Sequence, residues 1–392
     1  MKRNITLLYA IRSIRTFLLF VPVIVPFFQE NGLTQTQIYT VQSIYAVMIV
    51  LLEIPSGYFA DYVGRKRSML VGVIFAVIGH VAYCYAHDFS TILIGAINLG
   101  IAYSFISGAD SALAYDSLLT IKKESDYRKF EAYSYSLTGI SEAAASIIGG
   151  LLALVTLRLP LYVQTSIYLT LIPLVLLLQE PQREKKKTKN PLVDIIDITK
   201  YALIQQQEVK WLIFYSATLG TLTYTMVWLT QPYYQLLGIS LGWFGILWST
   251  QLGFMAIFAR YANAYEMYLG KTKAFASFTV IGSVSYIVMG CYPSLITLPF
   301  ILGFYLVRGV HTPIFQDYVN AIVSSDIRAT VLSVKNLVQK LQYAILGPII
   351  GVVTDAYSIQ TALLFSGVMY GMIGGYTLWR MNKLKIFSEV KD

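Results

Sequence analysis

Charged residues are scarce in this sequence. They make up 13% of its 392 residues, whereas 56% are hydrophobic, and the mean hydropathy is +0.59. Soluble domains carry about a quarter charged residues. The composition therefore excludes an ordinary soluble protein and indicates a protein of the lipid bilayer.

Cysteine and histidine are also rare. Cys84 and Cys291 lie near the outer ends of two apolar segments in opposite halves of the chain, so we expect no structural disulfide. The sequence has no cysteine–histidine cluster, no phosphate-binding glycine loop and no nucleophile elbow. We therefore expect no metal, no cofactor, no enzymatic activity and no ATP-driven transport by this chain alone.

Apolar segments of the length needed to cross a bilayer recur along the whole chain. We count twelve, with eleven or thirteen as alternatives because Pro, Gly and aromatic residues interrupt several of them. The predicted spans are 5–28, 36–60, 67–86, 90–116, 131–155, 160–178, 210–236, 240–262, 272–292, 294–317, 330–354 and 357–380. The predicted fold class is an all-α integral membrane protein.

The formal charge of +9 does not indicate a nucleic-acid site, because the basic residues follow the predicted topology. With the amino terminus inside, most of them lie in or beside cytoplasmic segments, and Arg158 alone falls in an outer loop. This asymmetry predicts cytoplasmic amino and carboxyl termini and contacts with anionic lipids.

A polar, basic stretch divides the spans into two groups of six. We expect an N-terminal bundle over 1–180, a linker over 181–209 and a C-terminal bundle over 210–392. Apolar residues at helical spacing within the linker allow either an amphipathic helix on the inner membrane surface or a solvated tether. The segments Gly108–Asp116 and Gly309–Asp317 share one glycine-to-aspartate spacing, which indicates an internal duplication.

A short loop between the second and third spans reads GYFADYVGRKR over residues 57–67. It combines an acid, a glycine turn and three cations. The pattern Gly-x-x-x-Asp-x-x-Gly-Arg-Lys resembles the cytoplasmic signature loop of the major facilitator superfamily of secondary transporters. The matching residues are Gly57, Asp61, Gly64, Arg65 and Lys66.

This resemblance implies two six-helix bundles related by pseudo-symmetry, which move a solute by alternating access. It also implies that Asp116 joins Asp61 and Arg65 in a charge cluster that holds the halves together in the outward-facing state. The segment Glu53-Ile-Pro-Ser-Gly57 and the segment 308–317 resemble a poorly characterised bacterial branch with drug-exporter-like members.

The fifth span resembles the motif of drug–proton antiporters, with two departures. Gly149 and Gly150 match its end, but Ala145 and Ser146 stand where Gly-Pro is expected, and the fourth span lacks the arginine usual in those antiporters. Both departures count against an antiporter.

Ionisable groups at bilayer depth are costly, so each is a functional candidate. The proton-coupling candidates are Glu142, Asp110, Glu53 and His311. Glu142 lies in an otherwise small and apolar run and could exchange a proton near neutral pH; an ion pair with an arginine or a substrate contact are the alternatives. The depth of Asp110 favours a buried partner, for which Arg12 and Arg15 are the candidates; its role is either in transport or structural.

The superfamily resemblance places spans one, four, seven and ten around the substrate cavity. The substrate candidates are Arg12, Arg15, Thr221, Thr225, Trp228, Gln231 and Arg308. The threonine hydroxyls could instead bond their own backbone. Arg308 and His311 could form an anion clamp, or Arg308 could pair with Glu142 or Asp110.

The sequence therefore predicts a monomeric secondary transporter of the bacterial cytoplasmic membrane. We expect proton-coupled efflux of a small organic solute. An uptake symporter or facilitator for a nutrient or metal-chelating molecule is the alternative. A polytopic membrane enzyme and a transporter-like sensor are more remote hypotheses.

Overall fold

A computed structural model describes residues 1–181, 199–324 and 327–389. Within these ranges the regular structure is entirely helical. Twelve helical segments of the described chain are long and apolar enough to cross a membrane. The predicted fold class, with twelve transmembrane spans, is therefore confirmed.

The first six spans run from Lys2 to Leu176. They are formed by α1 (Lys2–Thr16), η1 (Val21–Val23) and α2 (Ile24–Glu30); α3 (Gln35–Tyr62); α4 (Arg65–Cys84); α5 (Phe89–Ile106) and α6 (Ala109–Thr120); η2 (Glu124–Asp126) and α7 (Tyr127–Ala153); and α8 (Leu159–Leu169) and α9 (Leu171–Leu176).

The last six spans begin at Gln207. They follow η3 (Tyr201–Gln205) and are formed by α11 (Gln207–Leu236); α12 (Leu241–Arg260), which precedes the short α13 (Ala262–Leu269); α14 (Lys271–Cys291); η4 (Leu295–Phe300) and α15 (Ile301–Ile322); α16 (Arg328–Ala356); and α17 (Ile359–Lys383), with α18 (Ile386–Glu389) after it.

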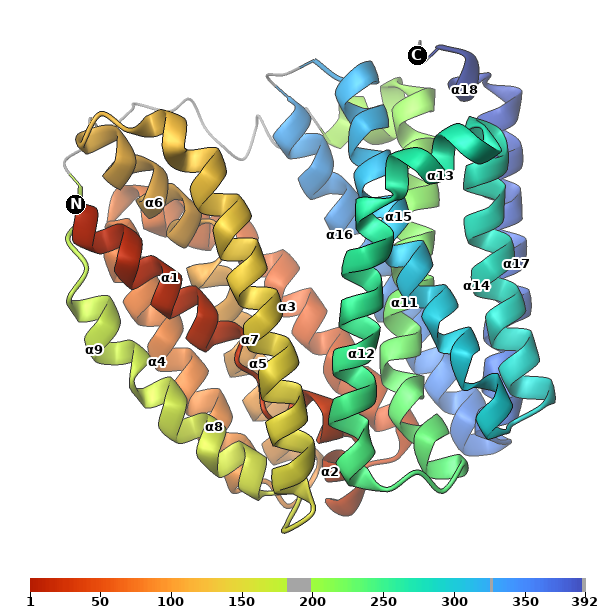
Figure 1. Ribbon diagram of the computed structural model, residues 1–392, viewed down its shortest axis with the longest axis horizontal. Coiled ribbons are helices and arrows are strands. Elements are labelled where there is room, and N and C mark those ends of the chain that lie inside the picture. The colour runs from red at the N-terminus through yellow and green to blue at the C-terminus, as the bar shows by residue number, and fades with distance from the viewer. Residues whose placement is uncertain (182–198, 325–326, 390–392) are drawn as a thin grey trace. The chain divides into compact units, whose positions relative to one another are not determined.

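The described residues form two compact units, each of them a bundle of long helices (Figure 1). The first takes 1–33, 44–181 and 239–250, and the second takes 34–43, 199–238, 251–324 and 327–389. Two short segments, 34–43 and 239–250, thus pack with the unit that lies across the linker in sequence. Most of the predicted linker, 182–198, lies outside the described residues, so the division at 181–209 stays a prediction.

Two predicted spans, 5–28 and 90–116, are each interrupted in the structure. The first breaks after Thr16 because Pro22 has no N–H and its ring would collide with the carbonyl four residues earlier. The side chain of Gln164 receives the Leu19 N–H at 2.7 Å, so the backbone donor at the break is satisfied. The second breaks at Gly108, whose φ of +80° suits glycine best.

Glycines allow α4 and α5 to pack closely in the first unit. A Cβ on Gly72 would lie 2.9 Å from the Ala102 carbonyl oxygen, and one on Gly79 would lie 3.0 Å from the Gly95 carbonyl oxygen. Small residues at such crossings are the usual way for membrane helices to approach one another.

The amino end of α3 is capped within the second unit by Asp355, near the end of α16. Its carboxylate accepts the Gln35 N–H at 2.9 Å, the Thr36 N–H at 2.8 Å and the Thr36 hydroxyl at 2.5 Å. A carboxylate at a helix amino terminus satisfies unpaired N–H groups and favours the helix dipole.

Candidate functional site

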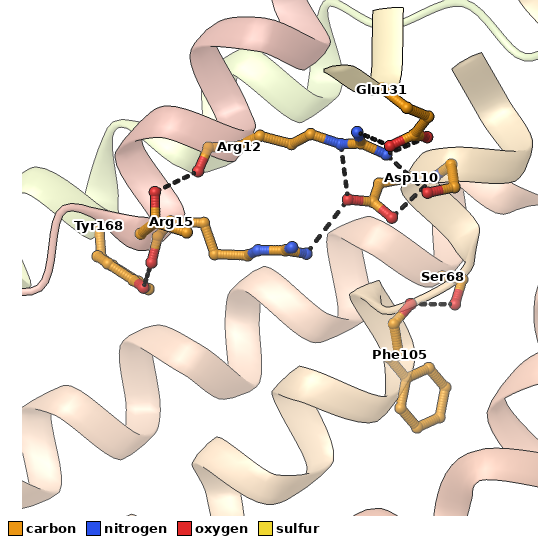
Figure 2. A network of polar contacts seen from close by, with 9 residues as sticks. Arg12, Arg15, Ser68, Phe105, Asp110, Glu131 and Tyr168 are labelled. Atoms are coloured by element: carbon orange, nitrogen blue, oxygen red, sulfur yellow. Dashed lines mark hydrogen bonds and ion pairs between the residues drawn. The ribbon is translucent and has the colours of Figure 1, made fainter. Parts of the chain in front are cut away.

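A buried ion-pair network lies in the first unit, where α1, α6 and α7 meet (Figure 2). Its centre is the pair Arg12 and Asp110, which are 6% and 4% exposed. Arg12 Nε lies 3.1 Å from Asp110 Oδ2, and Arg15 Nη1 approaches the same oxygen at 3.4 Å. The predicted pairing of Asp110 with these arginines is therefore seen in the structure.

Glu131 at the start of α7 completes the network. Its two carboxylate oxygens accept hydrogen bonds from Arg12 Nη1 at 2.8 Å and Nη2 at 3.2 Å. Arg12 Nη2 also donates to the Ser111 hydroxyl at 2.7 Å, and the guanidinium lies 4.8 Å from the ring centre of Phe130. Every nitrogen of the Arg12 guanidinium is thus engaged, and the bidentate geometry with Glu131 fixes its orientation.

Glu131 is not among the site residues predicted from the sequence. It is the first residue of the predicted span 131–155, where an acid is an ordinary membrane-surface residue. The sequence does show that Glu131 lies at a span end next to Tyr and Phe residues. This position does not indicate which helix its carboxylate contacts.

The signature loop joins four helices at one end of the first unit. Arg65 contacts both the Asp116 carboxylate and the Ala112 carbonyl of α6. Lys66 Nζ donates to the Leu176 carbonyl at the end of α9, at 2.8 Å. Asp61 is exposed near the end of α3. Arg65 and Asp116, two of the three residues predicted to form the charge cluster, are therefore in contact.

Glu180 forms a helix cap that was not predicted from the sequence. Its carboxylate oxygens accept the backbone N–H groups of Arg65 and Lys66, each at 2.8 Å, and so cap the amino terminus of α4. The loop glycine Gly64 has φ of +130°, and a Cβ there would lie 3.2 Å from the Glu180 carboxylate. The positive φ favours glycine at this position, and a Cβ would crowd the approach of this anion.

Gly57, the first residue of the signature pattern, differs from Gly64. It lies within α3, and a Cβ on it would meet nothing within 4 Å. This structure gives no packing reason for glycine there.

Glu142 is half-buried in the middle of α7. Its carboxylate lies 3.5 Å from the indole nitrogen of Trp248, a residue of the 239–250 segment that packs in the same unit. The neighbouring Ser249 hydroxyl donates to the Ala143 carbonyl at 3.0 Å. Glu53, the third acid considered for proton coupling, is exposed on α3.

The four substrate candidates on α11, which are Thr221, Thr225, Trp228 and Gln231, are buried inside the second unit. Thr221 donates to the Ala217 carbonyl at 2.8 Å, as a threonine bonding its own helix does, and Thr225 pairs with the Tyr370 hydroxyl at 2.7 Å. Gln231 is 1% exposed and Trp228 8% exposed. These residues offer little surface in this state, and their substrate role stays a prediction.

The two basic candidates of the second unit, Arg308 and His311, lie in different surroundings. Arg308 is exposed on α15, where it lines a small cavity of about 10 Å³ with Thr223, Thr230 and four other side chains. His311, one turn later, is 4% exposed and packs against Phe278 and Phe315. The structure thus places His311 among rings, and an anion clamp with Arg308 stays a prediction.

Among the described residues, no group of three or more His, Cys, Asp or Glu side chains is placed to hold a metal ion.

Known proteins resemble this chain over nearly its full length. Residues 5–341 match the family model described as Major Facilitator Superfamily. No curated protein sequence matches the chain significantly.

Solved structures share the fold at low sequence identity. The nucleoside transporter NupG superposes with a TM-score of 0.80 at 14% identity, covering 97% of this chain and 99% of its own. A bacterial homologue of the human lysosomal transporter Spinster gives 0.77 at 15% identity, covering 99% and 98%. A D-xylose–proton symporter gives 0.72 at 12% identity, covering 96% of each chain. At these identities the likeness concerns the fold alone.

Proposed function

Because the chain belongs to the Major Facilitator Superfamily, we propose that this secondary transporter exports a small organic solute in exchange for protons. The observation that carries the proposal is the charge network of Arg12, Arg15, Asp110 and Glu131 inside a membrane-spanning unit. Ionisable groups are retained at such depth mainly for solute, ion or proton pathways.

In this proposal Glu142 and Asp110 have different roles. Asp110 lies within ion-pair distance of two guanidinium groups, and it serves as a counter-ion that holds α1 against α6. Glu142 lies beside the neutral indole of Trp248 on a helix of small residues. We assign proton exchange to Glu142 because it is a half-buried carboxylate in the middle of a membrane-spanning helix, where ionisable groups are retained mainly for ion or proton pathways.

We also propose where the transporter is located and how it is oriented in the membrane. The transporter lies in the bacterial cytoplasmic membrane as a monomer with both termini in the cytoplasm, supported by the distribution of basic residues. The Arg65–Asp116 contact is proposed to stabilise the outward-facing state.

The test is a flux assay in liposomes. The purified protein is reconstituted with a trapped pH dye, a proton gradient is imposed, and pools of small organic solutes are screened for solute-triggered proton movement. We expect a response that Glu142→Gln abolishes and that Glu124→Gln, an exposed acid of the same unit, leaves within about twofold. Solute flux that ignores the proton gradient in the wild-type protein would refute proton coupling.

Uptake by proton symport is the second candidate. It is favoured by the departures at Ala145 and Ser146 from the antiporter pattern, and one neighbour of the same fold is a D-xylose–proton symporter. In the same vesicles, a symporter moves solute and protons in one direction, whereas the proposed exporter moves them in opposite directions. The sign of the dye response for a given solute gradient therefore separates the two.

A further inference from the structure

Positive charge at membrane depth is matched by carboxylates in the first unit but not at two positions in the second. Arg12 and Arg15 of the first unit pair with Asp110 and Glu131. Arg308 and Lys335 of the second unit lie within candidate spans. Neither forms an ion pair with a carboxylate in the described part of the chain.

The contacts of Lys335 are with neutral groups. Its Nζ donates to Gln339 Oε1 at 2.9 Å and to Asn336 Oδ1 at 3.4 Å, and it lies 5.9 Å from the ring centre of Phe315. Amide oxygens and an aromatic face stabilise an ammonium group without neutralising it. The positive charge is therefore held in place and left uncompensated.

Arg308 lies on the same face of α15 as Phe315. The two are seven residues apart, which is two helical turns. Lys335 Nζ lies 5.9 Å from the ring centre of Phe315, so the face of α15 that carries Arg308 also lies near Lys335. Arg308 is exposed there.

His311 lies between Arg308 and Phe315 along α15, one turn after Arg308. It is 4% exposed, and its Nε2 has no hydrogen-bond partner among the described residues. A buried ring nitrogen without a hydrogen-bond partner leaves a further polar group for a ligand to satisfy.

We propose that the transported solute is an organic anion, whose carboxylate or phosphate group binds between Arg308 and Lys335. Isolated cations are costly at bilayer depth, and an anionic solute would supply the charge that the second unit lacks. Arg308 would bind two oxygens through its planar guanidinium, while Lys335 contributes a point charge. This inference rests on the proposed transport function and names its substrate class.

The test measures thermal stabilisation of the full-length protein in nanodiscs of phosphatidylcholine, a lipid without net charge. The probes are pairs of an acid and its neutral counterpart, such as benzoate with benzamide and phenyl phosphate with phenol. We expect at least one acid to raise the melting temperature and its neutral counterpart to have no effect. Adding phosphatidylglycerol tests the other source of the same chemistry, a lipid headgroup.

Substitutions locate the effect. Arg308→Gln and Lys335→Met should each weaken binding of the acid about tenfold or more, the loss expected for a charge-assisted hydrogen bond. Arg308→Lys keeps the charge and should retain part of the affinity, which separates lost binding from a fold that has failed. The matched control is Arg380→Gln, a cation of the same unit that stacks 4.9 Å from the Trp211 ring and should bind the acid normally.

The outcomes distinguish this inference from the transport proposal. The inference is wrong if neutral members bind as well as acids, if no acid binds, if Arg308→Gln leaves affinity within twofold, or if phosphatidylglycerol alone stabilises the protein. Transport of a neutral or cationic solute in the liposome assay would then leave the transporter proposal intact. Acid-specific stabilisation that is lost in Arg308→Gln supports the inference.

Discussion

At the scale of single residues, Arg12 has the most completely satisfied charged side chain of the candidate site. It contacts two carboxylates, a hydroxyl and an aromatic ring while being 6% exposed. Desolvation of such a group is offset only while its partners remain. The network should therefore respond to substitutions as one unit.

Arg12→Met and Asp110→Asn should each lower the free energy of unfolding by about 3–5 kcal/mol, because each leaves buried partners uncompensated. The double variant should lose clearly less than the sum. Denaturant unfolding of the purified protein in detergent measures all three. Arg3→Met, an exposed cation on the same helix, is the control and should stay within about 0.5 kcal/mol of wild type. Additive losses would show that the two residues act independently.

The partners of Asp110 could be predicted from sequence, whereas Glu131 and Glu180 could not. Asp110 lies within an apolar span, and burial cost alone requires a cation nearby. Glu131 and Glu180 lie at span ends, where an acid can remain in water. Their contacts depend on which helix faces meet, which the spacing of residues within one helix does not contain.

At the scale of helices, the glycines of α7 set how closely it approaches the break in the first span. A Cβ on Gly149 would lie 1.7 Å from the Leu19 carbonyl oxygen, whereas one on Gly139 of the same helix would meet nothing within 4 Å. Gly149→Ala should destabilise the protein by about 1–3 kcal/mol through overpacking. Gly139→Ala should be neutral or slightly stabilising, because alanine favours a helix. Equal melting temperatures for the two variants would contradict this account.

The Glu180 carboxylate that caps the amino terminus of α4 gives a second prediction at the scale of helices. Glu180→Ala removes the acceptor of two backbone N–H groups, and about 1 kcal/mol of stability should be lost. Hydrogen exchange should accelerate in the first turn of α4 and remain unchanged in α5. Glu124→Ala, an exposed acid elsewhere on the first unit, controls for the change in net charge. Unchanged exchange in α4 would show that the cap contributes nothing.

At the scale of the whole molecule, the apolar lengths along the sequence were enough to predict twelve spans. The interruptions at Thr16 and Gly108 were not predicted as helix ends, because a break inside a span is stable only when another helix satisfies the freed backbone groups. Likewise, the packing of 34–43 with the second unit and of 239–250 with the first comes from tertiary contacts that no local pattern encodes.

The Arg65–Asp116 contact yields a prediction about the transport cycle. Asp116→Arg and Arg65→Asp should each slow solute turnover about tenfold, because each puts two like charges at the contact. The double variant, with the charges exchanged, should recover most of the rate. Arg67→Gln, in the same loop, should have little effect. The measurement is solute flux in the reconstituted system, and failure of the exchanged pair to recover would remove the contact from the proposed gate.

Asp355 has a consequence for the order in which the chain acquires structure during synthesis. The cap of α3 is supplied by a residue made 320 positions later. At about 5–20 residues per second, the ribosome needs roughly 16 to 64 seconds to cover 320 residues. Throughout that interval the first N–H groups of α3 must be satisfied by water or lipid headgroups. The second span of the nascent protein therefore reaches its final hydrogen bonding only after the eleventh has been made.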